Sequence, residues 1–410
     1  MSVRKKYDKN VRKTYEQVET HTLDNHDMML MVINMECPRC HNKDNDYFFR
    51  IKDDVYCRKC IQFSRVNVNE IVKTTQLDYP RLSVEYALQF DLSLKQKEIA
   101  LQLLENYKNH LNSYVNVVCG GGKTELVFDV IKYALSCGHR VCFCVPRKEL
   151  VRELYERIQK AFDDVDIGVF YGGVQKNPLA QFIVCTMHQL YRFEKTGFQL
   201  MIADEIDAFP FYGNEVLNAI FDHCVKGNFI KMSATFDDED VKDGKMLIMN
   251  RRYHGYDLPL PRSIICPLLL QKLFIVILLL YVKRRWIVYV PTIETGEQLY
   301  RFLKKFITDI SFVSSQTSHN SNALHALKTK LHYILISTTL LERGITVENV
   351  HVIVYQGEHQ VFDTRTLIQI AGRVGRKPDY HSGDVIILHS HRSREITKCI
   401  KIIKEKNNTV

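Results

Sequence analysis

Residues 120–124 read Gly-Gly-Gly-Lys-Thr, and their position between an apolar run and a helix-like stretch constrains the fold more than any other feature. The run over 115–118 predicts a strand, so we expect a strand, a tight loop and a helix in that order. Glycines let backbone N–H groups close around phosphate oxygens, a lysine reaches the β- and γ-phosphates, and a threonine hydroxyl binds Mg²⁺. A glycine-rich turn without a nucleotide is the alternative interpretation. The predicted ligands of ATP and Mg²⁺ are Gly120, Gly121, Gly122, Lys123 and Thr124.

A pair of acidic residues, Asp204 and Glu205, follows the apolar run over 200–203. An NTPase needs such a pair downstream of its phosphate loop, at the end of a buried strand. There Asp204 can hold Mg²⁺ while Glu205 polarises the attacking water as a general base. The two motifs together favour ATP hydrolysis over nucleotide binding alone.

Helix-like and strand-like segments alternate along most of the chain, which predicts an α/β fold of parallel sheets covered by helices. In a first lobe we expect helices over 93–108, 125–136 and 148–162 and strands over 141–145, 167–170, 182–185 and 200–203. In a second lobe we expect strands over 286–290, 333–337, 350–355 and 384–388 and helices over 296–307 and 364–371. We divide the chain into a flexible basic tail (1–35), a cysteine module (36–68), lobe 1 (69–257) and lobe 2 (258–400).

Four of the twelve cysteines form two Cys-x2-Cys pairs in the module. Two matched pairs can close a tetrahedral shell of four thiolates around Zn²⁺, which fits better than a redox dithiol. No coordination position stays open, so the role of the metal is structural. The predicted ligands are Cys37, Cys40, Cys57 and Cys60. The module also carries basic and aromatic residues suited either to a nucleic-acid contact or to an ordinary solvated surface: Arg39, Arg50, Arg58, Lys59, Tyr47, Phe48 and Tyr56.

Composition narrows the setting of the protein. The formal net charge of +9 suits a polyanionic partner without requiring one. Scattered cysteines and the lack of a signal peptide at the start predict a cytoplasmic protein. The segment 264–282 is rich in leucine and isoleucine, but its clean apolar run over 273–282 is too short to span a bilayer. We expect this segment to be buried between the lobes rather than in contact with a membrane.

Three later motifs narrow the class of enzyme. Residues 231–235 read Lys-Met-Ser-Ala-Thr, residues 336–344 include Thr338 and Thr339, and residues 369–376 read Gln-Ile-Ala-Gly-Arg-Val-Gly-Arg. Their order after the phosphate loop resembles the motif set of superfamily 2 helicases and translocases. This resemblance implies two RecA-like lobes, with Arg373 and Arg376 reaching the γ-phosphate only when the cleft closes. Salt-bridging arginines on a helix are the alternative.

Several finer matches resemble one family, the ComFA ATPases of bacterial competence. They lie at 186–193, 204–211, 258–261 and 341–346, and the four-cysteine module of that family corresponds to residues 37–60. The resemblance implies an ATP-dependent translocase that draws single-stranded DNA into the cytoplasm. It also implies competence proteins and a membrane DNA channel as partners. The resemblance further implies that the motor lies at the inner face of the cell membrane without spanning it. Gln96 is the residue assigned to adenine recognition, while Ser233 and Thr235 relay the nucleotide state.

Two other functions stay open at this stage. A replication-restart or repair helicase is the first, although the primosomal relatives carry their cysteines inside the second lobe. A zinc-dependent DNA-binding or scaffold protein with an inert core is the second, and the intact Lys123, Glu205 and Arg376 argue against it.

Overall fold

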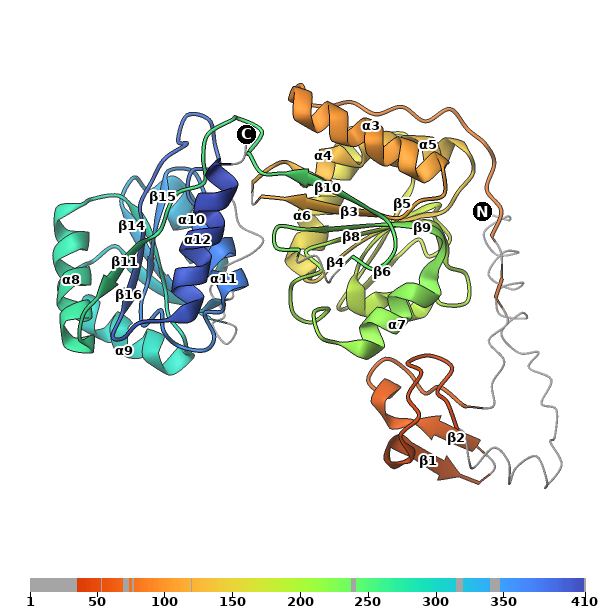
Figure 1. Cartoon of the computed structure of the whole chain (residues 1–410), viewed down its shortest axis with the longest axis horizontal. Coiled ribbons are helices and arrows are strands. Elements are labelled where there is room, and N and C mark those ends of the chain that lie inside the picture. Colours follow the sequence, from red (N-terminus) through yellow and green to blue (C-terminus); the bar gives the residue numbers. More distant parts are fainter. Residues whose placement is uncertain are drawn as a thin grey trace. The chain divides into compact units, whose positions relative to one another are not determined.

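The computed structural model describes residues 35–52, 54–68, 74–75, 77–118, 120–236, 241–314, 320–339 and 347–408. Nearly all of the predicted tail over 1–35 lies outside the described residues, as do Glu342, Arg343 and Gly344 of the motif at 336–344. The chain divides into two compact units, Met1–Val72 and Lys73–Val410, and each is described by itself. Figure 1 gives the elements of both.

The first unit is built around a β-hairpin. Strand β1 (Phe48–Ile51) pairs antiparallel with β2 (Asp54–Cys57), and two short 3₁₀ turns, η1 (Asn45–Tyr47) and η2 (Arg58–Cys60), flank them. Val55, Phe63 and Val66 form the small apolar core, which is much too small to stabilise a module of this size alone. A metal ion held by the four cysteines would supply the stability that this core lacks.

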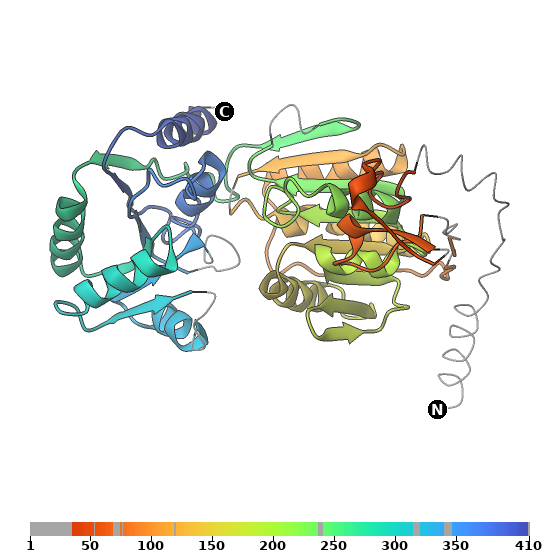
Figure 2. The ribbon, with the colours of Figure 1, turned by 90° about the horizontal axis from the view of Figure 1, so that it is seen from below.

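Lobe 1 contains an eight-stranded sheet in the order β10-β3-β9-β8-β4-β7-β5-β6. All pairings are parallel except that of the edge strand β6 with β5. Figure 2 shows β10 along the edge beside β3. The strands are β3 (Ser113–Val117), β4 (Val141–Val145), β5 (Ile167–Tyr171), β6 (Val174–Lys176), β7 (Phe182–Thr186), β8 (Phe198–Asp204), β9 (Val225–Ser233) and β10 (Lys245–Met249).

Helices cover both faces of this sheet. Figure 1 shows α3 (Leu94–Lys108) and α5 (Phe128–Ser136) on one side and α7 (Glu215–Cys224) on the other. Helix α6 (Lys148–Ala161) shares the apolar core of α3 and α5, while η3 (Met187–Phe193) packs against α7. The predicted helix over 125–136 is broken: α4 (Lys123–Leu126) ends at Val127, whose φ of −97° and ψ of 1° leave the helical region before α5 begins.

Lobe 2 has a six-stranded sheet in the order β11-β16-β15-β12-β14-β13, with every pairing parallel. Its strands are β11 (Arg262–Ile265), β12 (Arg285–Tyr289), β13 (Ile310–Val313), β14 (Tyr333–Ser337), β15 (Val350–Val354) and β16 (Val385–His389). Helices α8 (Leu268–Tyr281) and α9 (Ile293–Leu303) cover one face, and α10 (Asn320–Thr329), α11 (Thr364–Ala371) and α12 (Arg394–Asn408) cover the other. The predicted α/β class with two parallel-sheet lobes is confirmed.

The apolar segment 264–282 is not buried between the lobes, so that prediction was wrong. It forms β11 and α8, and α8 buries only the face with Ile275, Val276 and Leu279 against the lobe 2 sheet. The opposite face is solvent-exposed, with Leu269 77% and Tyr281 84% exposed. No helix within the described ranges has the length and apolar content to cross a membrane. Helical periodicity thus divides the segment into a packed side and an apolar surface.

The last helix contacts lobe 1 and the segment between the lobes. Lys406 Nζ on α12 donates to the carbonyl oxygen of Ala234, 2.7 Å away, just after β9. At the next residue, the Asn407 amide both donates to the Leu258 carbonyl and accepts from the Leu258 N–H, each at 2.9 Å. The end of α12 is therefore joined to the motif at 231–235 and to the connection into lobe 2.

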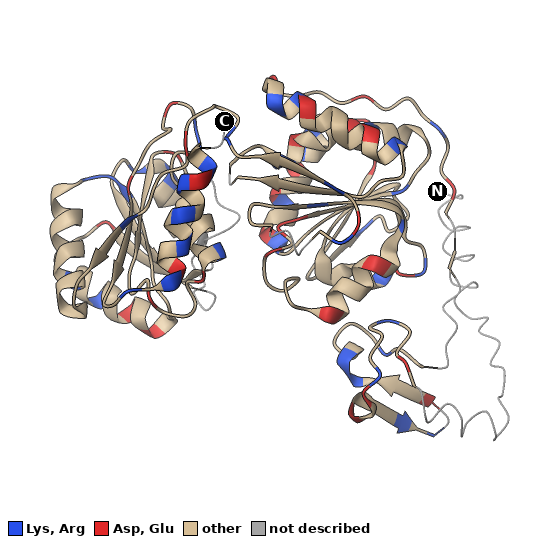
Figure 3. Cartoon of the chain, viewed as in Figure 1, with Lys and Arg blue, Asp and Glu red and all other residues tan. Residues whose placement is uncertain are grey.

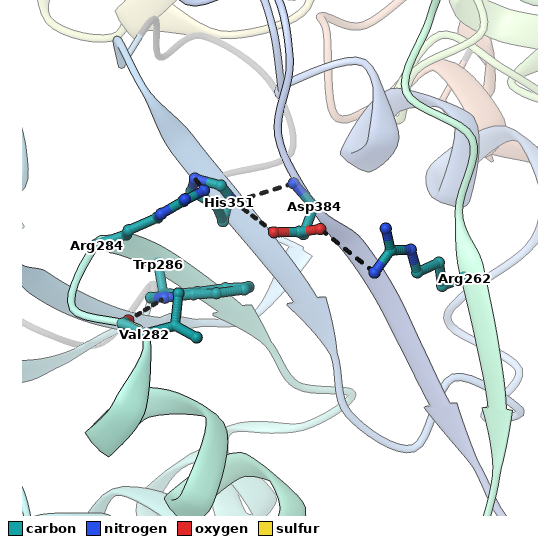
Figure 4. Close-up of polar contacts among 6 residues, drawn as sticks. All are labelled: Arg262, Val282, Arg284, Trp286, His351 and Asp384. Atoms are coloured by element: carbon teal, nitrogen blue, oxygen red, sulfur yellow. Dashed lines mark hydrogen bonds and ion pairs between the residues drawn. The ribbon is translucent and has the colours of Figure 1, made fainter.

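A buried histidine, His351, lies with its polar neighbours where β15 and β16 of lobe 2 begin (Figure 4). His351 Nδ1 lies 3.1 Å from Asp384 Oδ2, and His351 Nε2 accepts from Arg284 Nη1 at 3.2 Å. A guanidinium only donates, so this arrangement requires the neutral imidazole. Burial lowers the pKa of His351, and the nearby Arg284 charge acts in the same direction.

Candidate nucleotide site and metal centre

The phosphate loop links β3 to α4, as the sequence predicts. Gly120 and Gly122 have φ values of 80° and 72°, a left-handed backbone that favours glycine. Gly121 needs to be glycine for space, because a Cβ there would lie 2.3 Å from Val117 Cγ1. Lys123 and Thr124 open α4 directly after Gly122, while the Gly121 N–H donates to the Val118 carbonyl oxygen at 3.0 Å and shapes the loop. The arrangement fits a phosphate chain.

Gln96 supports this loop. It caps the first turn of α3, where its Oε1 accepts from the Ser93 N–H at 2.9 Å. Its Nε2 donates to the Gly121 carbonyl oxygen at 3.1 Å, and the whole side chain is buried. Both polar atoms of the amide thus bind the chain itself, and adenine recognition by Gln96 stays a prediction.

Asp204 and Glu205 stand at the end of β8, beside the phosphate loop. Lys123 Nζ lies 3.5 Å from Asp204 Oδ1. Burial raises the pKa of Asp204, against the opposing effect of the Lys123 charge, and the negative charge of Glu205 adds to the rise. Glu205 has a φ of 56° and donates its N–H to Asp204 Oδ1 at 2.8 Å. A non-glycine residue in this region costs about 1–2 kcal/mol, which is typical of functional sites.

The motif at 231–235 is joined to the acidic motif through Asp207. Thr235 Oγ1 donates to Asp207 Oδ2 at 2.6 Å, and the Thr235 N–H donates to Ser233 Oγ at 3.0 Å. Gln369 Nε2 on α11 of lobe 2 lies 3.5 Å from the same Asp207 Oδ2. Asp207 is therefore the point where three motifs meet, a role that sequence reasoning did not assign to it.

The arginine motif of lobe 2 is held by a residue that the sequence did not single out. Arg252 follows β10, is 2% exposed, and donates to the carbonyl oxygens of Gly372 (3.1 Å), Val374 (2.7 Å) and Gly375. Adjacent residues continue the contact, since the Tyr253 hydroxyl donates to the Arg376 carbonyl at 3.3 Å. We call residues 252–254 the arginine-loop brace.

The two predicted arginines lie in this braced segment. Arg376 Nε donates to the Gly372 carbonyl at 3.1 Å, and a Cβ on Gly120 would lie 3.4 Å from Arg376 Cγ. Arg376 is thus next to the phosphate loop. Arg373 is buried. Sequence reasoning missed the brace because its only signal is a pair of arginines at 251–252, of which the first is exposed.

The four module cysteines converge on one point. Their sulfur atoms all lie within 4.8 Å of one another, with Cys37 Sγ 3.8 Å from Cys60 Sγ and Cys40 Sγ 3.7 Å from Cys57 Sγ. With Zn–S bonds of about 2.3 Å, an ideal tetrahedron has S···S edges of about 3.8 Å, so the cluster fits Zn²⁺. Hydrogen bonds among three of these thiols lower the pKa of Cys37 and raise the pKa values of Cys40 and Cys60.

Arg39 locks the two knuckles together. Its Nη2 donates to Ser64 Oγ at 2.9 Å and its Nη1 to the Ser64 carbonyl at 3.3 Å, and the residue is buried. Arg39 is therefore not exposed for the nucleic-acid contact that the sequence suggested. Its function in the fold is to join the segments that carry the two cysteine pairs.

Comparison with known proteins agrees with this geometry. Residues 89–238 match the family described as type III restriction enzyme, res subunit, and residues 269–378 match the helicase conserved C-terminal domain. The chain is 31% identical over 391 residues to competence protein ComFA of Streptococcus pneumoniae, covering 90% of each chain. It is 32% identical over 396 residues to competence protein ComFA of Bacillus subtilis, covering 90% of this chain and 85% of that protein.

Solved structures show the same fold. Saccharomyces cerevisiae Dbp5 bound to RNA and ADP BeF3 superposes with a TM-score of 0.56 at 18% identity, covering 78% of this chain and 93% of Dbp5. A variant of Dbp5 bound to a variant of Gle1 and to IP6 gives a TM-score of 0.51 at 19% identity, covering 80% of this chain and 94% of that one. At this identity the likeness concerns the RecA-like architecture alone.

Proposed function

This chain belongs to the ComFA family of competence proteins and is an ATP-hydrolysing enzyme of the superfamily 2 helicase type, and on that premise we propose that it is a motor that moves along single-stranded DNA. The movement draws transforming DNA into the cytoplasm during natural competence. Each step along the strand is coupled to one cycle of ATP binding and hydrolysis between the lobes.

One observation carries the proposal: two sets of side-chain contacts, joined by the backbone of residues 204–207, connect the phosphate loop to lobe 2. Lys123 is paired with Asp204, Asp207 of the same motif binds Thr235, and Gln369 of lobe 2 reaches Asp207. A change at the γ-phosphate therefore has a route to the other lobe. A binding protein with an inert core has no need of such a route.

The chemistry follows from the charges at the site. Lys123 and the loop N–H groups hold the phosphates, and Thr124 and Asp204 are the residues that fit Mg²⁺. Bound Mg²⁺ would neutralise charge on the phosphate oxygens. Glu205 orients the attacking water and receives its proton, and Arg373 and Arg376 stabilise the charge that develops in the transition state. Hydrolysis thus depends on groups from both lobes.

The test compares nucleic acids in parallel. ATP hydrolysis by the purified chain is measured with single-stranded DNA, duplex DNA, RNA and no nucleic acid. We expect stimulation by single-stranded DNA above the other three. Equal rates in all four would overturn the motor proposal, and stimulation by duplex DNA or RNA alone would assign a different track.

The proposal also places the protein at the inner face of the cell membrane, next to competence proteins and a DNA channel. The exposed face of α8 supports this location, with Leu269, Leu273 and Ile277 in solvent. Figure 3 shows no acidic residue on α8, and the sequence holds none between Asp257 and Glu294. An apolar helix face bordered by basic residues such as those at 283–285 fits an anionic lipid surface.

Vesicle sedimentation tests this location. We expect the chain to pellet with vesicles rich in anionic lipid and to be released when Leu269, Leu273 and Ile277 are changed together to Gln. Leu331→Gln, an equally exposed leucine elsewhere in lobe 2, is the matched control. Identical pelleting of the α8 variant and the control would refute the lipid contact.

A further inference from the structure

The outer face of the zinc-module hairpin is mostly apolar and largely exposed. In the register of β1 and β2, Phe49 stands opposite Tyr56 and Ile51 opposite Asp54, while Val55 and Cys57 point to the buried side. Side chains alternate along a strand, so Phe49, Ile51 and Tyr56 share the outer face with Asp54, whose Oδ1 accepts from Asn67 Nδ2 at 2.5 Å. Phe49 is 47% exposed, and a module this small gains nothing in stability from an apolar residue left in water.

Cations border this face. The Phe49 and Tyr56 rings lie with centroids 5.5 Å apart, and the Arg65 guanidinium lies 5.6 Å from the Tyr56 centroid. Nearby on the module, Lys59 Nζ lies 4.6 Å from the centroid of Tyr47, which is also exposed. An exposed ring, Tyr47, and a half-buried ring, Tyr56, are thus each paired with a positive charge in one small module. The outer hairpin face with its bordering cations is called the ring platform below.

We infer that the ring platform is a second binding site for single-stranded DNA, separate from the two lobes, in which bases stack on Phe49 and Tyr56 while Arg65 and Lys59 contact phosphates. Stacking on aromatic rings beside positive charges is how proteins bind single strands without reading their sequence. In duplex DNA the faces of the bases are covered by their neighbours, so the platform discriminates against it.

This inference deepens the proposed function, because it rests on single-stranded DNA being the track of the motor. A site that stays bound while the lobes change their grip keeps the strand from leaving between cycles. The consequence is kinetic: the platform contributes to DNA affinity and to the length of a run, whereas the rate at saturating DNA is set by the lobes. The two contributions are separable by titration.

The experiment uses the full chain loaded with Zn²⁺ and a fluorescent oligothymidine of about 16 nucleotides, the upper end of ordinary site sizes. Phe49→Ala and Tyr56→Ala are each expected to weaken equilibrium binding by about 10-fold. Arg65→Ala should reduce the slope of log affinity against log salt by about 0.7, the loss of one phosphate contact. ATP turnover at saturating DNA should stay within the error of wild type.

Ile61→Ala is the matched control, because Ile61 is 53% exposed on the same module but follows η2 and is not on the hairpin. Bound zinc is measured for every variant, so that loss of the fold is seen as loss of metal. Wild-type affinity in zinc-loaded Phe49→Ala and Tyr56→Ala would overturn the inference and leave the face to a protein partner. The absence of any DNA stimulation in wild type would instead sink the proposed function.

Discussion

Arg252 should control turnover although it has no atom among the predicted catalytic groups. It is buried and donates to three carbonyls of the arginine motif, whereas its neighbour Arg251 is exposed. Arg252→Met keeps an unbranched apolar stem and removes every donor. Arg251→Met is the same chemical change one residue earlier, so the pair isolates the brace from any effect of net charge.

The structure sets the size of the effect. Three hydrogen bonds from a charged donor would amount to about 4.5–9 kcal/mol if each contributed its usual 1.5–3 kcal/mol. Two of the acceptors keep another partner, because Gly372 also accepts from Arg376 and Gly375 is also contacted by His254. The Val374 carbonyl, in contrast, loses the donor that Arg252 supplied. We therefore expect Arg252→Met to cost about 2–4 kcal/mol of stabilisation, mainly of the position of the arginine motif.

The assay is DNA-stimulated ATP turnover, with ATP-analogue affinity and thermal unfolding measured on the same samples. Arg252→Met should lower kcat at least 10-fold while the affinity for the analogue, which depends mainly on the lobe 1 loop, changes less. Arg251→Met should match wild type in all three. If Arg252→Met and Arg251→Met had the same kcat and the same melting temperature, the brace would have no role in placing the arginines.

Three further outcomes follow from the nucleotide site, the metal centre and the buried His351. Lys123→Ala and Glu205→Gln should each abolish turnover measured by phosphate release, and wild-type rates in either would contradict the assigned roles. Cys37→Ser should lose the bound metal and unfold the module locally, seen as protease cleavage before residue 73, with the lobes still folded; metal analysis showing no zinc in the wild type would count against the site. Burial lowers the pKa of His351, so the unfolded state takes up a proton at a higher pH than the folded state does. The contribution of His351 to the free energy of unfolding should therefore be fully present above pH 6.5, the ordinary pKa, and decrease as the pH falls below it. The decrease is at most about 1.4 kcal/mol per pH unit for this one group. His351→Asn should flatten the acid side of a melting-temperature profile, and an unchanged slope would refute the cause. Three other histidines with lowered pKa keep part of the slope: His139, His188 and His254.

Local patterns predicted most of the scaffold. The strands over 141–145 and 333–337 and the helix over 364–371 occur at the predicted residues, because each is a short apolar or periodic run with clear ends. The interruption at Val127 was not predictable, since the apolar periodicity runs through residues 125–136 without a break. The exposure of α8 was misjudged for a related reason: apolar content alone does not tell which side of a helix finds a partner.

The candidate site divides in the same way. Motif spacing predicted the residues of the phosphate loop and of the acidic motif, which the structure brings together, because their chemistry requires particular side chains at fixed places in the chain. Asp207 and Arg252 act by holding other motifs, and a contact between residues 252 and 374 leaves no trace in a single sequence. The ring platform falls between these cases, as the module's aromatics were visible but only the hairpin register selected Phe49 over Phe48.

The contacts at the end of α12 decide where a reporter group can be attached. Lys406 and Asn407 hold Ala234 and Leu258 from the last turn of that helix. A purification tag or fluorescent protein fused directly after this turn would strain the contact with the motif at 231–235 and change the ATPase activity that it was meant to follow. Attachment at the amino end avoids that interference, and a comparison of the two fusions measures how strongly the last turn restrains the cycle.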